Sequence, residues 1–419
     1  MFGYNICMFD SLVTLFGSDT FIVVLKVLYY ASWIFIPLFL FVAAWTLWVH
    51  HVRALFFAKQ SYLVLEVKLP KDIFKSPKAM EFFINGLWQP GGEGSFMDKY
   101  WRGQTRSWFS LEIVSIEGDI HFFIWTKKSF RGAIEANLYS QFPGIELYEV
   151  PDYTLSAKFN PEENNIWGTH FALTKPDAYP IKTYMDYGLD KDPEEEYKID
   201  PITPLIEFLG SIGKNHNVWI QIIIRAHAAE DKDPVTGKLV DLRWSKGGEA
   251  EIAKILDKAK SKKDEAGKET PGTQLTKTQL ETVEALERSI SKNGFDTGIR
   301  AIYFAPKDVF NGSFTGGVIG GLSHFNSKHL NGFRPAHGLG VKYAWLFDRR
   351  GEKLIKQKEE LLDAYKKRMY FYAPHRTDHF ILNTEELATI FHFPGGVSTT
   401  PTFTRIESKK AEAPSNLPI

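Results

Sequence analysis

Two histidines near the C-terminus have a spacing that could bind a metal ion. His375 and His379 stand four residues apart in PHRTDHF, with Asp378 between them. On a helix, this spacing would place both imidazoles on one face, where they could hold zinc. However, Pro374 precedes the pair and the β-like FIL follows it, and neither favours a helix. Zinc needs three or four ligands, and no cysteine or further histidine lies close by, so we expect no metal site here.

Three other patterns resemble binding loops without completing one. Gly210–Asn215 (GSIGKN) has the wrong first spacing for a phosphate-binding loop, and Asn215 stands where a Mg²⁺-binding hydroxyl is needed. The acidic run 190–196 lacks the spaced oxygens, glycine turn and distal glutamate of a calcium loop, and it reads as a solvated loop. The glycine-rich 315–323 is no dinucleotide fingerprint, which favours glycines that pack helices. No catalytic arrangement stands out, so the sequence predicts a protein that is not an enzyme and uses no cofactor.

An aromatic strand offers a candidate face for nucleic acid or a partner protein. His121, Phe123 and Trp125 alternate, so their side chains would share one face of a strand. RNA-recognition domains stack bases on exposed aromatic rings of this kind. The basic-glycine-aromatic signature of that family is missing, and fifty basic residues balance fifty acidic ones. Such rings also belong commonly to a core or an interface, and the sequence leaves these alternatives open.

The segment that would position everything else is an apolar run near the N-terminus. Val27–Val49 contains 23 residues without a charge. Since about 20 apolar residues cross a hydrocarbon core of about 30 Å, the run predicts a transmembrane helix. Pro37 in its middle predicts a mild kink. Amphipathic rings favour the two membrane interfaces, and this run has them at both ends: Tyr29, Tyr30 and Trp33 at one, Trp45 and Trp48 at the other.

The distribution of positive charge predicts the orientation of this helix. Lys26 precedes the run, whereas Arg53 and five lysines follow within 30 residues. The positive-inside rule therefore predicts a single-pass protein of the plasma (inner) membrane, with its N-terminus outside and its bulk in the cytoplasm. The only cysteine, Cys7, cannot form an internal disulfide, which suits a reducing compartment. A cleaved signal peptide is the alternative, but MFGYNICMFD lacks a basic start.

The rest of the chain predicts an α+β body made of two ferredoxin-like units. Strands are predicted at 62–69, 109–115, 121–126 and 145–150, with helices at 76–87 and 129–141. This β-α-β-β-α-β order is that of a split βαβ fold, and a second unit repeats it. The repeat uses strands near 167–174, 218–226 and 299–304, and a charged helix follows at 352–369. The predicted domains are 1–60 (membrane helix), 61–160 and 161–345 (the two units), 346–395 (C-terminal helices) and 396–419 (polar tail).

An insertion interrupts the second unit at 245–293. Its first part is rich in Lys, Glu and Ala, and Thr270-Pro271-Gly272 then breaks the pattern. Leu280, Val283, Leu286 and Ile290 form an apolar stripe on a second helix. The pattern predicts a solvated helical hairpin with a flexible joint, and an arm that docks a partner is the alternative.

Four strings together resemble a known family. LEVKLPKDIFKSPKAME, WFSLEIVSIEGDIHFFIW, VWIQIIIRA and TEELATIFHFPG are similar to an uncharacterised family of membrane-anchored proteins from small-genomed uncultured bacteria of the candidate phyla. The resemblance covers nearly the whole chain. In that family, this module is often N-terminal to, or encoded beside, a conjugative coupling ATPase of type IV secretion. The resemblance implies a non-catalytic assembly or docking component of such a DNA- or protein-translocating apparatus.

One departure from the family concerns the ATPase. Fused members continue into it, whereas this sequence reaches Ile419 without a Walker motif. We therefore expect a separate P-loop ATPase or other secretion subunits as partners, besides the lipid bilayer and a further copy of the chain. The polar tail is then a candidate docking segment, with these residues as candidate contacts: Pro401, Arg405, Pro414 and Leu417. The alternative function is a membrane-tethered protein that binds single-stranded nucleic acid through 121–125 and the Lys-rich 246–263.

Overall fold

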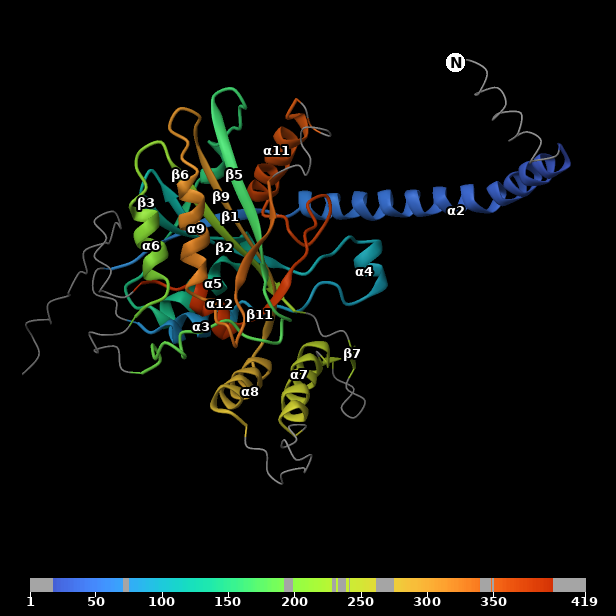
Figure 1. Ribbon diagram of the computed structural model, residues 1–419. Helices are drawn as coiled ribbons and strands as arrows, with labels where there is room; N and C mark the ends of the chain where they lie inside the picture. Colours follow the sequence, from blue (N-terminus) through green and yellow to red (C-terminus); the bar gives the residue numbers. More distant parts are fainter. Residues whose placement is uncertain are drawn as a thin grey trace, which may run out of the picture. The chain divides into compact units, whose positions relative to one another are not determined.

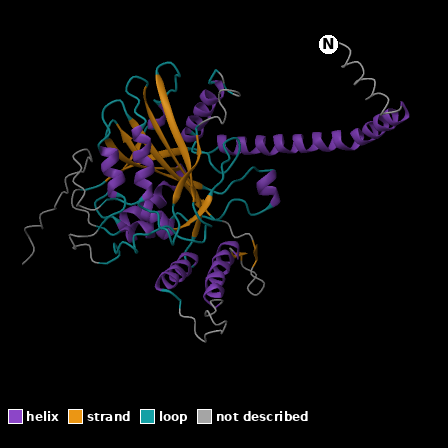
Figure 2. Ribbon diagram, viewed as in Figure 1, coloured by secondary structure: helices purple, strands orange, loops and turns teal. Residues whose placement is uncertain are grey.

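Within the described residues, nine strands form one antiparallel sheet that organises the body of the protein (Figures 1 and 2). The structure is a computed structural model, and it describes residues 18–70, 75–191, 199–227, 231–232, 239–240, 242–260, 275–339, 348 and 350–394. The chain divides into two compact units, one of residues 1–60 with 92–105 and one of residues 61–91 with 106–419. The predicted α+β class, with an N-terminal helix apolar enough to span a membrane, is confirmed at this level.

The strands of the large sheet follow one another in the order β10–β5–β9–β6–β2–β3–β1–β4, and β11 also pairs with β9. Every pair between neighbouring strands is antiparallel. The strands are β1 (Tyr62–Lys68), β2 (Trp108–Ile116), β3 (Asp119–Lys127), β4 (Glu146–Val150), β5 (Asn164–Leu173), β6 (Asn217–Ala226), β9 (Gly294–Pro306), β10 (Phe333–Gly338) and β11 (Phe380–Asn383). A separate two-residue pair joins β7 (Asp231–Lys232) to β8 (Leu239–Val240).

The two halves of the sheet have the same internal order. In chain order, the first half runs β1–α3–β2–β3–α5–β4, and its strands lie in the sheet as β2–β3–β1–β4. The second half runs β5–α6–β6–β9–α9–β10, and its strands lie as β6–β9–β5–β10. The halves meet where β2 pairs with β6, from Trp108 opposite Arg225 to Ile116 opposite Asn217. The second strand of each half therefore joins the two into one sheet.

Helices cover both faces of this sheet. Figure 1 shows α3, α5, α6, α9 and α12 on one face and α11 on the other. The helices of the body are α3 (Pro77–Gly86), α5 (Arg131–Gln141), α6 (Thr203–Gly210), α7 (Leu242–Lys260), α8 (Lys277–Ile290), α9 (Ser313–Ser323), α11 (Glu352–Lys366) and α12 (Thr384–Ile390). The other compact unit contains α2 (Ser18–Ala58) and α4 (Phe96–Tyr100).

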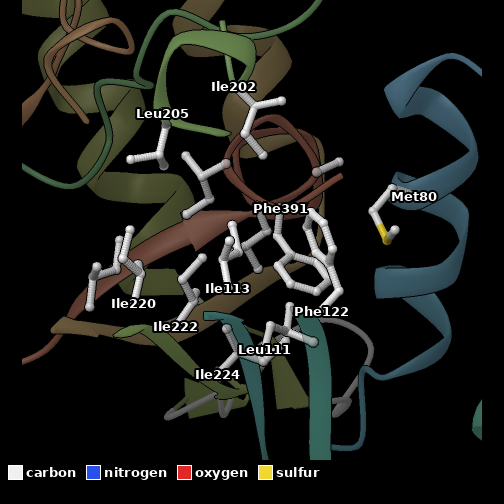
Figure 3. Close-up of a cluster of buried hydrophobic side chains, with 14 of the residues drawn as sticks. Met80, Leu111, Ile113, Phe122, Ile202, Leu205, Ile220, Ile222, Ile224 and Phe391 are labelled. Carbon is white, nitrogen blue, oxygen red and sulfur yellow. The ribbon is translucent and has the colours of Figure 1, made fainter. Parts of the chain in front are cut away.

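The main hydrophobic core lies under the face with five helices. Alternate residues of β2, β3 and β6 point into it, as expected for side chains on a strand. Figure 3 shows Leu111, Ile113 and Phe122 of the sheet near Met80 of α3 and Phe391. The rings of Phe122 and Phe391 meet edge to face, 5.9 Å apart. The apolar runs of the sequence therefore become one continuous core.

Most predicted elements are confirmed to within a few residues, and the differences have local causes. β9 is longer than the predicted 299–304 because it pairs with β5, β6 and β11 along its length. The helix predicted at 352–369 ends at Lys366, where Arg368 adopts a left-handed φ of 50°. The glycine-rich 315–323 packs helices as predicted, because a Cβ on Gly317 would approach the Phe208 ring of α6 to 2.1 Å. The insertion supplies α7 and α8, which pack together, and its predicted joint at 270–272 lies outside the described residues.

The short helix α12 holds a buried carboxyl group. Asn383 caps the helix, and Glu386 completes the capping box by accepting a hydrogen bond from the Asn383 N–H at 2.9 Å. The other oxygen of Glu386 accepts from the Ile181 N–H at 2.9 Å. Burial raises the pKa of Glu386 to about 8. At neutral pH this carboxyl group is therefore mostly protonated in the folded protein.

We expect Glu386 to make stability depend on pH. Its folded pKa lies above its unfolded value, so its contribution is complete below about pH 4.5 and is lost as pH rises through about 8. Glu386→Gln should remove this loss, whose slope approaches about 1.4 kcal/mol per pH unit. The substitution also lowers the free energy of unfolding by an amount that does not depend on pH, because the NH₂ group of the glutamine cannot accept a hydrogen bond from a backbone N–H.

The measurement is the thermal unfolding midpoint of the detergent-solubilised protein from pH 5 to 9. Glu359 is exposed, so Glu359→Gln is the matched control, and its unfolding midpoint should change with pH in the same way as that of the wild type. If the midpoint of Glu386→Gln also follows that of the wild type across this pH range, Glu386 does not titrate as described.

Candidate functional site

The membrane-anchor candidate is helix α2. In the described part of the chain, Tyr29–Ala58 is the one helix long and apolar enough to cross a membrane, a test that a signal sequence also passes. The described side chains of its apolar run are mostly exposed, Trp33 at 68% and Phe39 at 72%. So large a contiguous apolar surface is unfavourable in water and is typical of a helix that lipid covers.

The predicted interface residues lie along this helix. The ring of Tyr29 lies 5.7 Å from that of Tyr30 and 6.4 Å from that of Trp33. Pro37 lies inside α2, and the helix continues through it. Arg53 follows on the same helix and is half-buried. These residues therefore share one continuous element, as a single-pass anchor requires.

The other end of the apolar run belongs to an aromatic cluster. We use this term for Trp45 and Trp48 of α2 with Phe96, Tyr100 and Trp101 of the 92–105 segment. The ring of Trp45 lies 6.3 Å from Phe96, 5.5 Å from Tyr100 and 5.8 Å from Trp101. The indole N–H of Trp48 donates to the Tyr100 carbonyl at 3.0 Å. These contacts place α4 beside α2 within one compact unit.

A glycine allows the segment to approach α2 closely. Gly103 has a φ of 63°, a left-handed conformation that side chains rarely adopt. A Cβ there would also lie 2.4 Å from the Val52 carbonyl oxygen of α2. The sequence does not reveal the cluster, because its two parts are separated by about 50 residues. The sequence feature that could have indicated the cluster is the string FMDKYW. It lies between glycines and has a high aromatic content for a loop.

The aromatic strand predicted as a binding face lies mostly inside the protein. The ring of Phe123 stacks on Tyr153 at 4.8 Å, and that of Trp125 stacks on Tyr62 at 4.4 Å. Both side chains are buried, with 4% and 7% of their surface exposed. His121 is half-buried and bonds to Glu66 at 2.7 Å. A nucleic-acid base could stack on Phe123 or Trp125 only by displacing a tyrosine.

The two histidines considered as metal ligands do not come together. His375 contacts Asp363 at 2.7 Å, whereas His379 lies 3.7 Å from Asp296, so each histidine faces a different carboxylate. Among the described residues, no group of three or more His, Cys, Asp or Glu could hold a metal ion. Residues 192–198 and the tail residues Pro401, Arg405, Pro414 and Leu417 lie outside the described part of the chain.

The sequence did not reveal a buried polar layer on the α11 face of the sheet. In register across the sheet, Glu112 of β2 lies opposite Gln221 of β6, which lies opposite Arg300 of β9. Gln221 donates to Glu112 at 2.7 Å, and Arg300 donates to Gln221 at 2.6 Å. All three side chains are fully buried. The available signal was a long polar or charged residue inside an otherwise apolar run, such as Gln221 in VWIQIIIRA.

Arg368 connects this layer to the segment after α11. Its guanidinium donates to both Glu112 oxygens, at 3.0 and 3.2 Å, and to Asp152 at 3.0 Å. Burial alone would lower the pKa of Arg368, but Glu112 and the other partners raise it well above the ordinary value. Arg368 is therefore a permanent buried cation, and its two carboxylates are the groups that make its burial tolerable.

A second ion cluster surrounds Asp296 of β9. Arg225 donates to it at 2.7 Å, Arg106 lies 3.3 Å away, and His227 bonds to its other oxygen. Burial would raise the pKa of Asp296, but these neighbours hold it well below its usual range. Arg225 also lies over the Phe371 ring, 4.3 Å from its centroid. The cluster therefore fixes the 371–379 segment on the same face as Arg368.

Comparison with known proteins gives one positive result. The model of a family described as a domain of unknown function (DUF8128) matches residues 56–404, which is most of the chain. The match begins at the end of α2 and includes the 92–105 segment, the whole sheet and α12. No curated protein matches the chain. The family description carries no activity, so function has to be argued from the anchor and the body.

We expect Arg368→Met to be strongly destabilising. The substitution leaves the buried Glu112 and the half-buried Asp152 without their cation, and removing one partner of a buried ion pair typically costs about 3–5 kcal/mol. Arg350→Met is the matched control, because the Arg350 side chain is 87% exposed, and it should change stability by less than about 0.5 kcal/mol. Urea unfolding followed by tryptophan fluorescence measures both. Equal midpoints for the two variants would contradict the role given to Arg368.

Proposed function

The chain belongs to the DUF8128 family, and on that premise we propose that it is a membrane-anchored, non-catalytic assembly or docking component. Its apparatus would be of the type IV secretion kind, translocating DNA or protein with a separate P-loop ATPase. The single observation that carries the proposal is α2, an exposed apolar helix followed directly by a large α+β body. The resemblance of four strings to proteins associated with such ATPases supplies the choice of apparatus.

We further propose that each half of the sheet is a ferredoxin-like unit. Two observations support this proposal, the β-α-β-β-α-β chain order and the strand order fourth–first–third–second in each half. The pairing of β2 with β6 would then join two units through equivalent edges. Such a joined sheet leaves β4 and β10 as its end strands, and these edges are natural sites for assembly contacts.

The polar character of the α11 face also suits a structural role. The described carboxylates and arginines there are held by partners within the protein, which is typical of a rigid scaffold. The aromatic strand 121–125 offers no free ring, which removes the main support for the single-stranded nucleic-acid alternative. We therefore favour a platform that holds other proteins at the membrane.

We predict that the N-terminus lies outside and the body in the cytoplasm. Cys7 is the only cysteine, so a membrane-impermeant maleimide should label the wild-type protein in intact cells. A Cys7→Ser, Lys277→Cys variant carries its thiol on the body, where the Lys277 side chain is 91% exposed, and should react only after the membrane is opened. Reversed labelling would contradict the orientation. If neither thiol is labelled even after the membrane is opened, the reagent does not report the orientation.

We also predict a stable complex with a P-loop ATPase that depends on the tail. The full-length protein, co-expressed with its neighbouring genes and solubilised in detergent, should recover such an ATPase in an affinity pull-down read by mass spectrometry. Deletion of 396–419 should abolish the recovery, and a scrambled tail of equal length and charge is the matched control. Recovery of envelope proteins without an ATPase would overturn the secretion role and leave a structural membrane component.

A further inference from the structure

The 92–105 segment exposes apolar side chains beside the anchor. Phe96 is 61% exposed, Met97 53% and Trp101 47%. Large apolar side chains scattered singly on a surface need no explanation, but here three of them gather on one short segment. Part of each aromatic ring is used in the cluster with α2, and the rest remains uncovered. The segment therefore has an apolar surface that something should cover.

The segment is amphipathic. On a helix, residues four apart share a row, so Phe96 aligns with Tyr100 on α4, and Met97 aligns with the C-cap residue Trp101. Asp98 and Arg102, which follows the C-cap, form a charged row and pair at 2.8 Å, and Lys99 is a further charge of the helix. Ser95 caps the helix by accepting from the Asp98 N–H at 3.2 Å. An apolar side with a charged row beside it is the pattern of segments that lie in a membrane interface.

The position along α2 matches such an interface. The segment packs on Trp45 and Trp48, the last aromatic residues of the apolar run, which ends at Val49. Aromatic rings at this place on a spanning helix lie at the level of the lipid headgroups. A Cβ on Gly103 would lie 2.4 Å from the Val52 carbonyl oxygen, so the segment passes close to α2 just beyond this level.

We propose that the 92–105 segment is a second membrane contact, in which Phe96, Met97 and Trp101 enter the headgroup–acyl boundary of the bilayer that α2 spans. The inference rests on the proposed membrane anchoring by α2 and adds its lipid-facing neighbour. Lipid is the occupant because the exposed side chains adjoin the exposed apolar surface of α2: Phe96 and Trp101 contact Trp45, and Trp101 also contacts the exposed Trp48. The charged row of Asp98 and Arg102 then meets the headgroups and water.

The test uses the full-length chain in vesicles of phosphatidylcholine with a minority of phosphatidylglycerol. Cys7 is replaced by serine, and a single new cysteine carries an NBD fluorophore at Met97, Leu40 or Lys277. Met97 is more than half exposed, so the label fits without opening the cluster. Leu40 lies in the middle of the apolar run, and the 91% exposed Lys277 reports water. Nitroxide groups on lipid chains, at shallow or deep positions, quench the label according to its depth.

We expect the label at 97 to be blue-shifted and quenched several-fold more strongly than at 277, most by the shallow nitroxide. At 40 the deep nitroxide should quench most. A water-like signal at 97 with a buried signal at 40 would overturn this inference and leave the anchoring intact. A blue shift at 97 without lipid quenching would also overturn it, because protein would then cover the segment. A water-like signal at 40 would instead overturn the anchoring on which the inference rests.

Discussion

The buried pair between Arg368 and Glu112 is the interaction on which the body of this protein depends. Glu112 lies on β2, the strand that pairs with β6 to join the two halves, and its partner across that junction is Gln221. A carboxylate in this position would be costly without a cation, and Arg368 reaches it from more than 250 residues away. The pair therefore couples the junction of the sheet to the segment that follows α11.

The backbone at Arg368 shows what this coupling requires. Arg368 occupies the position after the α11 C-cap, where its N–H bonds to Tyr365 and the next N–H bonds to Ala364, the pattern of a Schellman motif. Glycine is usual there, because the left-handed φ of 50° is unfavourable for other residues. A glycine would end the helix at less strain but would leave Glu112 and Asp152 without their cation. The side chain's contacts therefore offset a local cost of about 1 kcal/mol.

Local patterns made much of the fold predictable, and the rest depended on distant contacts. Alternation identified the strands predicted at 62–69 and 121–126, which the structure has as β1 and β3. The pairing of β2 with β6 had no local signal, since both strands are largely apolar and nothing in either one identifies its partner. The candidate site was likewise predictable only where its signal was local.

The apolar run of α2 was evident from composition. The aromatic cluster, by contrast, joins residues about 50 apart in the sequence. The burial of Phe123 and Trp125 depends on Tyr153 and Tyr62, which lie on other elements.

The connections between the two compact units bear on how an anchor could serve a platform. The chain passes between the units three times, after residues 60, 91 and 105. The first connection leads into β1 and the third into β2, and both strands belong to the same sheet, with β3 between them. Because two of these connections lead into hydrogen-bonded strands, a force applied along either of them would be shared across the ladder of the sheet. Connections that lead directly into the sheet suit the membrane-anchored platform that we propose.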